Sequence, residues 1–242
     1  ICNDFEVAGS LLDVLLPTTC AICGRFGAAV CEPCSASLNF KVRSFQRQEL
    51  FGLTLASFEG VTRELVHAFK EEGKTAIAQV LATPLAKAIE HLLQLVAESE
   101  AEFKSGPTLL VPVPSSKQSF AARGFQPTRV LATAGLTAGF RTKRFTSQQV
   151  LLRNLLQMNS RGQQVDQAGL NRLARKTNRS HSMTASALGC SPNQSLIVFD
   201  DIVTTGSTLL EAQRSLRQAG FHRLYFFTFA ETLLKSASAE LD

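Results

Sequence analysis

A stretch of thirteen residues at 196–208, LIVFDDIVTTGST, limits the possible folds of this chain more than any other. Four consecutive apolar residues open it and predict a buried strand, which ends in the adjacent acids Asp200 and Asp201. A turn of small residues follows, and the apolar period over 209–219 predicts a helix. The stretch therefore predicts a strand, a turn and a helix in immediate succession.

The turn carries the residue types that a phosphate group requires. It consists of Val203, Thr204, Thr205, Gly206, Ser207 and Thr208. Glycine lets the backbone approach a ligand closely, and hydroxyls and N–H groups at a helix start suit a phosphate. The two acids suit sugar hydroxyls or a Mg²⁺ ion. The stretch predicts a sugar-phosphate ligand, and the alternative is an ordinary helix cap after a buried strand.

Length and composition favour a folded protein with one core and a small appendage. The chain has 242 residues, 45% of them apolar, and a net charge of +5 that permits an anionic ligand. No apolar run approaches the roughly eighteen residues of a membrane span, and Asp4 and Glu6 stand where a signal peptide carries basic residues. We expect a cytoplasmic protein.

Four cysteines near the N-terminus have metal-site spacing. Two C-x-x-C pairs are separated by seven residues, and they comprise Cys20, Cys23, Cys31 and Cys34. Four thiolates complete the tetrahedral shell of a structural Zn²⁺ and leave no open position for catalysis. Two disulfides are the alternative interpretation of these four cysteines. We expect Cys2 and Cys190 to be ordinary thiols.

Periodicity and turn residues place the remaining elements. The expected elements are an apolar helix over 11–16 before Pro17, a strand over 51–58, helices over 61–69 and 77–96, a strand over 145–152 and a last strand over 223–229. A further buried strand begins at Thr108 and ends in two prolines, which expose Ser115, Ser116 and Lys117. This exit is either a second anion loop, for pyrophosphate, or a simple end of the strand.

The stretch 157–183 is polar, aperiodic and basic. Such a stretch is a solvated linker or a mobile loop that an anion orders. Next to a phosphate site we favour a closing basic loop that excludes water.

The motif at 196–208 resembles the phosphoribosyl pyrophosphate (PRPP) loop of type I phosphoribosyltransferases. With the four-cysteine segment, the VPVP strand with its downstream Arg123-Gly124-Phe125, and the basic stretch, the order of motifs is similar to the ComF/GntX family. The resemblance implies an α/β fold whose phosphoribosyltransferase core has a parallel sheet flanked by helices. It also implies an N-terminal helix and zinc ribbon over 1–40 and a phosphoribosyltransferase-like domain over 41–242.

The resemblance also implies roles for single residues. Asp200 and Asp201 would hold the ribose hydroxyls directly or through Mg²⁺, and residues 203–208 would hold the 5-phosphate. Ser115, Ser116 and Lys117 would border the pyrophosphate, and Arg175 belongs to the basic loop. Two positions depart from the family pattern: Gln126-Pro127 replaces Asn-Gln, and Ala174 stands where an acid precedes the arginine.

The family is associated with natural competence and the handling of transforming single-stranded DNA. The resemblance therefore implies a candidate Mg²⁺-dependent phosphoribosyltransferase that binds PRPP and acts in DNA uptake. The alternative is a non-catalytic competence factor that binds protein partners or single-stranded DNA, with PRPP as a regulatory ligand. The nucleophile that would attack the ribose is not identified by any residue.

Overall fold

A computed structural model describes residues 18–99, 106–159 and 182–233. Its main element is a six-stranded sheet in the order β1-β2-β8-β7-β3-β4, and a separate two-stranded sheet pairs β5 with β6. The strands are β1 (Arg43–Arg47), β2 (Leu50–Ser57), β3 (Thr108–Pro112), β4 (Val150–Leu152), β5 (Leu156–Met158), β6 (Met183–Ala185), β7 (Leu196–Val203) and β8 (Leu224–Glu231).

The large sheet is mostly parallel. β2 pairs parallel with β8, β8 with β7, β7 with β3, and β3 with β4, while β1 adds an antiparallel edge through its hairpin with β2. The central strands β3 and β7 are apolar runs without alternation, as expected of strands that are covered on both faces. The sheet and its helices confirm the predicted α/β class.

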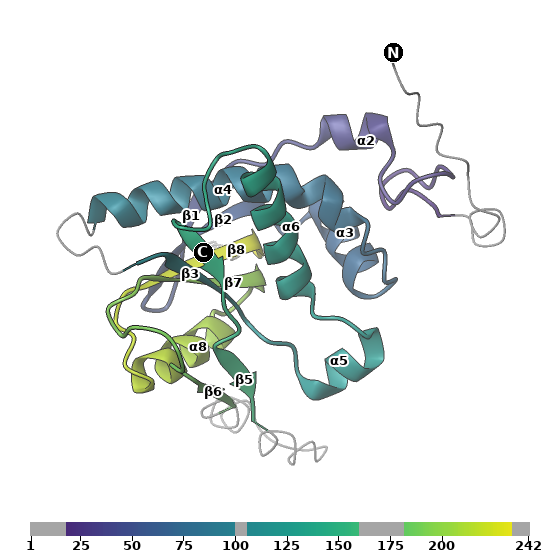
Figure 1. Ribbon diagram of the computed structural model, residues 1–242. Coiled ribbons are helices and arrows are strands. Elements are labelled where there is room, and N and C mark those ends of the chain that lie inside the picture. Colours follow the sequence, from purple (N-terminus) through teal and green to yellow (C-terminus); the bar gives the residue numbers. More distant parts are fainter. Residues whose placement is uncertain (1–17, 100–105, 160–181, 234–242) are drawn as a thin grey trace, which may run out of the picture.

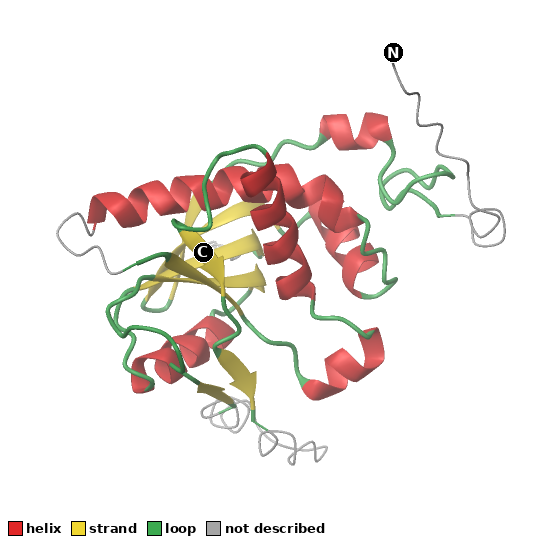
Figure 2. Cartoon of the chain, in the orientation of Figure 1, coloured by secondary structure: helices red, strands yellow, loops and turns green. Residues whose placement is uncertain are grey.

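Helices cover both faces of the sheet (Figures 1 and 2). α3 (Gly60–Lys70), α4 (Ile77–Ser99) and α6 (Pro127–Arg141) pack in one core cluster on one face, whereas α8 (Ser207–Gln218) packs with β5 and β6 in a second cluster on the other. Two shorter helices, α2 (Glu32–Ser37) and α5 (Lys117–Arg123), lie at the periphery (Figure 1).

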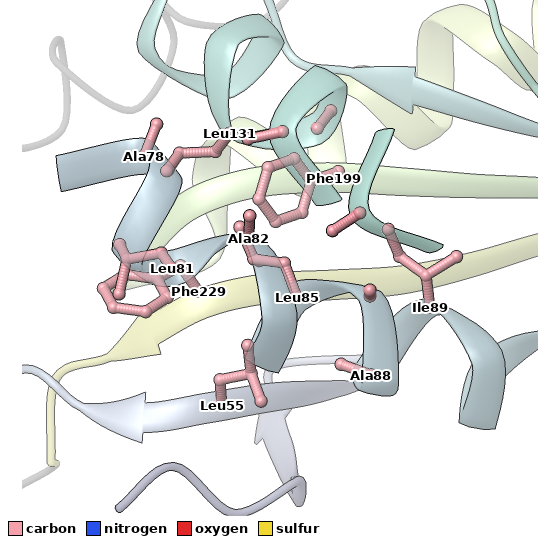
Figure 3. Close-up of a cluster of buried hydrophobic side chains, with 14 of the residues drawn as sticks. Leu55, Ala78, Leu81, Ala82, Leu85, Ala88, Ile89, Leu131, Phe199 and Phe229 are labelled. Atoms are coloured by element: carbon pink, nitrogen blue, oxygen red, sulfur yellow. The ribbon is translucent and has the colours of Figure 1, made fainter. Parts of the chain in front are cut away.

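The larger core lies between the sheet and the α4–α6 pair (Figure 3). Leu85 and Ile89 of α4 pack there with Leu131 of α6 and Phe199 of β7, all of them buried. A Cβ atom at Gly135 would lie 2.9 Å from the Cβ of Leu85, so this glycine lets the two helices approach closely. By length and composition α4 could cross a membrane, but its buried face shows that it is a core helix.

The structure confirms most of the expected elements and corrects several. The strands near 51–58 and 223–229 and the helices near 61–69 and 77–96 form as predicted. The strand expected over 145–152 is wrong in length, because only Val150–Leu152 pairs with β3 and a turn precedes it. α2, β1, α5 and the antiparallel pairing of β5 with β6 were not predicted. The expected helix at 11–16, Cys2, Arg175 and most of the basic stretch lie outside the described residues.

Candidate functional site

The two acids of the motif lie at the carboxyl-terminal end of β7 and are buried, at 8% and 9% exposure. Because successive strand residues point to opposite faces, Asp200 faces the α8 side and Asp201 faces the α3 side. The Asp201 N–H donates to Oδ1 of Asp200 over 2.9 Å. The structure thus brings both predicted carboxylates to the edge of the sheet, where parallel α/β folds bind ligands.

Lys70, the last residue of α3, supplies a cation to this pair. Its Nζ lies 3.0 Å from Oδ2 of Asp201, and both side chains are mostly buried. The sequence analysis missed this residue, because nothing in the local sequence indicates that α3 ends beside β7.

The electrostatics of the pair are asymmetric. Burial, and then the adjacent charge of Asp201, raises the pKa of Asp200 to about 8. The backbone hydrogen bond from Asp201 and the charge of Lys70 act in the opposite direction. A cation bound beside the pair would favour the ionised form of Asp200, and oxygen ligands of this kind suit Mg²⁺.

The turn after the acids has the predicted shape of a phosphate loop. Thr204 and Thr205 are exposed, and Gly206 has φ +81°, the left-handed region that favours glycine. α8 starts at the next residue, so the partial positive charge of its N-terminus faces the turn. A small hollow is lined by Asp200, by residues of this turn and by Thr208. The residues predicted to hold a 5-phosphate are therefore contiguous with the acid predicted to hold the ribose.

Hydroxyl groups in the turn already contact one another. The side-chain oxygens of Thr205 and Ser207 lie 2.7 Å apart, and the N–H of Ser207 donates to the Thr205 hydroxyl over 3.4 Å. This last bond is long, so an anion that accepts from the same N–H would replace a weak interaction.

The chain leaves the sheet after β3 at the same end of the sheet at which it leaves β7. The N–H of Val113 donates to the carbonyl oxygen of Phe199 over 2.8 Å, directly before Asp200. Ser115 and Ser116 are half-buried and Lys117 is exposed. Ser116 also caps α5, since its hydroxyl accepts from the N–H of Ser119 over 3.0 Å. The pyrophosphate role of these three residues stays a prediction.

The C-terminal end of the basic stretch, at Met183, is held on α8 by a buried acid. Glu211 accepts from the N–H of Met183 over 2.9 Å and from the guanidinium of Arg214 over 2.7 Å. Arg214 in turn donates to the carbonyl oxygen of Met183 over 3.0 Å. β6 is therefore fixed to the helix that begins at the phosphate loop.

The four predicted metal ligands gather into one cluster. The sulfur atoms of Cys20, Cys23, Cys31 and Cys34 all lie within 4.8 Å of one another. In a tetrahedral zinc site with Zn–S distances of about 2.3 Å, sulfurs lie roughly 3.8 Å apart. The 3.6 Å between the sulfurs of Cys23 and Cys31 fits that geometry. All four are free thiols, as is the half-buried Cys190, so the structure favours a metal site over two disulfides.

Hydrogen bonds within the cluster distribute the protons unevenly. Burial opposes ionisation of Cys20, but hydrogen bonds involving Cys23, Cys31 and Ile22 lower its pKa to about 6. Hydrogen bonding with Cys31, together with burial, raises the pKa of Cys34 to about 12. A sulfur that already gathers N–H donors is suited to a thiolate ligand, and zinc would displace the remaining protons.

Comparison with known proteins gives distant structural likenesses only. No protein-family model matches the chain, and no curated protein matches it in sequence. A solved structure of the allosteric regulatory enzyme of purine biosynthesis is 14% identical, covers 62% of this chain and 26% of its own, and has a TM-score of 0.33. A hypoxanthine phosphoribosyltransferase from Staphylococcus aureus is 13% identical, covers 60% of this chain and 64% of its own, and has a TM-score of 0.32.

The chain thus spans about a quarter of the first structure and less than two thirds of the second. The resemblance to the ComF/GntX family stays a prediction.

Proposed function

We propose that this protein binds PRPP and is a phosphoribosyltransferase-like protein. The observation that carries the proposal is the continuity of Asp200 with the turn at 204–208, at the carboxyl-terminal edge of a parallel sheet. A phosphate on the turn and ribose hydroxyls at the acids would occupy adjoining positions, as one ribose 5-phosphate unit requires.

The reaction would replace one bond at the anomeric carbon of the ribose. The bond from that carbon to pyrophosphate breaks, and pyrophosphate leaves with the electron pair. A nitrogen nucleophile forms the new bond and loses a proton. The protein would contribute by holding the 5-phosphate and ribose in place, and by electrostatic stabilisation of the positive charge that develops on the sugar.

The acids and Lys70 also fit a divalent cation. Asp200 and Asp201 are neighbouring oxygen donors, and Oδ2 of Asp201 already lies 3.0 Å from the ammonium of Lys70, a position that favours positive charge. When bound with PRPP, Mg²⁺ would neutralise the leaving pyrophosphate. The acids would hold the ion, and Lys70 would remain available for an anionic oxygen of the ligand.

A turnover assay tests the catalytic part of this proposal. Pyrophosphate release from Mg²⁺–PRPP is measured with a panel of nitrogen acceptors, from ammonia to purine and pyrimidine bases. We expect release with one class of acceptor, and loss of release in the Asp200→Asn, Asp201→Asn double variant with its fold intact. Full activity in that double variant would contradict the proposal. Binding of PRPP without release for any acceptor would favour a regulatory ligand instead.

A second candidate function, binding of single-stranded DNA, is favoured by one surface feature. A groove of about 780 Å³ runs along α4, α5 and α6 and is lined by Phe120, Phe125 and Arg129. Phe120 is 46% exposed, and Arg129 is exposed as well. Exposed aromatic rings beside cations provide stacking surfaces for unpaired bases.

A gel-shift titration tests this candidate. If the groove binds DNA, Phe120→Ala should weaken binding of a single-stranded oligonucleotide roughly tenfold, in line with the loss of one stacked base. Phe51→Ala is the matched control, because Phe51 is 67% exposed on β2. Binding that disappears at raised salt and is unchanged in Phe120→Ala would be a non-specific phosphate interaction and would contradict this role.

A further inference from the structure

The turn between β1 and β2 packs against the back of the loop at 204–206. Arg47, the last residue of β1, is buried, at 7% exposure. Its Nε donates to the carbonyl oxygen of Thr204 over 2.8 Å. Gln48, the next residue, donates through Nε2 to the carbonyl oxygen of Thr205 over 3.1 Å.

We propose that Arg47 and Gln48 are positioning residues that aim the backbone N–H groups of this loop at the bound 5-phosphate. The inference rests on the proposed function of the loop. In a planar trans peptide, the C=O of one residue and the N–H of the next point in opposite directions. Holding the carbonyls of Thr204 and Thr205 on the hairpin side therefore turns the N–H groups of Thr205 and Gly206 to the other side. Consecutive N–H groups that point the same way form an anion-binding concavity.

The rest of the guanidinium fixes Arg47 itself. One terminal nitrogen donates to the carbonyl oxygen of Gln46 over 2.8 Å. The other lies 3.2 Å from Oε2 of Glu231 and also donates to the carbonyl oxygen of Thr232. Three of the four partners are carbonyl oxygens, so the guanidinium works as a rigid fork that joins β1, the loop and the end of β8.

Close packing reinforces the hydrogen bonds. A Cβ atom at Gly206 would lie 2.9 Å from the Cβ of Arg47 and 3.4 Å from Cδ1 of Leu50. The glycine is thus required for contact with the hairpin as well as for its positive φ. The loop lies between the hairpin on one side and the anion side on the other, which limits how far its N–H groups can rotate.

The experiment measures ribose 5-phosphate affinity by calorimetry and Mn²⁺ affinity by electron paramagnetic resonance, with Mn²⁺ as the probe of the acid pair. We expect Arg47→Met to weaken ribose 5-phosphate binding roughly 10- to 100-fold, as misplaced binding groups do, and to leave Mn²⁺ affinity unchanged. General damage to the structure would weaken the binding of ribose 5-phosphate and of Mn²⁺ together. Arg47→Lys keeps the charge but lacks the fork, so it should stay impaired.

Arg43→Met is the matched control. Arg43 lies on the same strand and 4.0 Å from the same Glu231, but its side chain is 43% exposed and its hydrogen bond goes to Ser57. This variant should bind ribose 5-phosphate normally. Because Arg47→Met removes the closer of the two arginine partners of the buried Glu231, the double variant Arg47→Met, Glu231→Gln and the single variant Gln48→Gly provide folded alternatives. The Gln48 change should weaken binding roughly 2- to 10-fold, the effect of one hydrogen bond.

Wild-type ribose 5-phosphate affinity in a folded Arg47 variant would overturn the positioning role and leave the proposed function standing. Equal losses of ribose 5-phosphate and Mn²⁺ binding would also overturn it. Failure of the wild-type protein to bind ribose 5-phosphate would overturn the proposed function and this role together.

Discussion

The ammonium of Lys70 lies 3.0 Å from the carboxylate of Asp201, although the two residues belong to different elements, α3 and β7. The contact places a positive charge beside two adjacent buried acids at the edge of the sheet. It links the helix that follows β2 to the motif that the sequence analysis identified as the site. The charge of Lys70 also acts on Asp200, whose ionisation it favours.

Replacement of Lys70 should therefore make Asp200 harder to ionise. In Lys70→Met we expect the pKa of Asp200 to move higher than about 8, because the opposing positive charge is gone. The titration can be followed by NMR of ¹³C-labelled aspartate carboxyls. Lys87→Met, at an exposed position on α4, is the control and should leave the titration unchanged. An Asp200 titration identical in wild type and Lys70→Met would contradict this account.

The raised pKa of Asp200 predicts how stability depends on pH. The folded state holds this proton up to about pH 8, whereas the unfolded chain releases it near the ordinary value of 3.8. The folded protein thus binds more protons between these values, so the free energy of unfolding falls as pH rises from about 4 to 8 and this contribution is constant above 8.

Asp200→Asn removes that dependence. The variant should melt at a higher temperature than the wild type at pH 8, and the difference should shrink towards pH 4 because both side chains are then neutral. Melting curves across this range measure the effect. A difference in melting temperature that does not change with pH would argue against a protonated Asp200 in the folded state.

Gly206 should tolerate alanine less well than another glycine with positive φ. Gly189 has φ +73° and no atoms within 4 Å of the position that a Cβ would take, so Gly189→Ala carries only the conformational penalty of about 1–2 kcal/mol. Gly206→Ala adds a contact at 2.9 Å with the Cβ of Arg47. We expect a clearly larger loss of unfolding free energy in denaturant titrations, together with weaker phosphate binding. Equal losses of unfolding free energy in the two variants would show that the β1–β2 hairpin moves aside without cost.

The strand, turn and helix at 196–218 could be predicted because their signals are local. The apolar run, the two acids and the small-residue turn are adjacent in sequence, and so are the cysteine pairs. Lys70 and Arg47 could not be found in this way. Arg47 and Thr204 are 157 positions apart, and their contact depends on how the β1–β2 hairpin packs against the end of β7. A charged residue in a short strand also predicts exposure, whereas Arg47 is buried by its carbonyl partners.

Metal analysis tests the cysteine cluster. We expect about one zinc per chain, as the four-thiolate set implies. Cys23→Ser should lose the metal and lower the melting temperature by about 2–8 °C, for a loss of 1–2 kcal/mol in a chain of this size. Ribose 5-phosphate binding should persist, since no cysteine contacts the phosphate loop in the described structure. Cys190→Ser is the control, and retained zinc with unchanged melting in Cys23→Ser would refute the assignment.

The most direct measurement is a calorimetric titration of PRPP into the purified protein, with and without Mg²⁺, for the wild type and the Asp200→Asn, Asp201→Asn double variant. We predict that the wild type binds PRPP, that Mg²⁺ strengthens binding, and that the double variant loses the effect of Mg²⁺ while remaining folded. Absence of PRPP binding by the wild type in both conditions would contradict the assignment of this site.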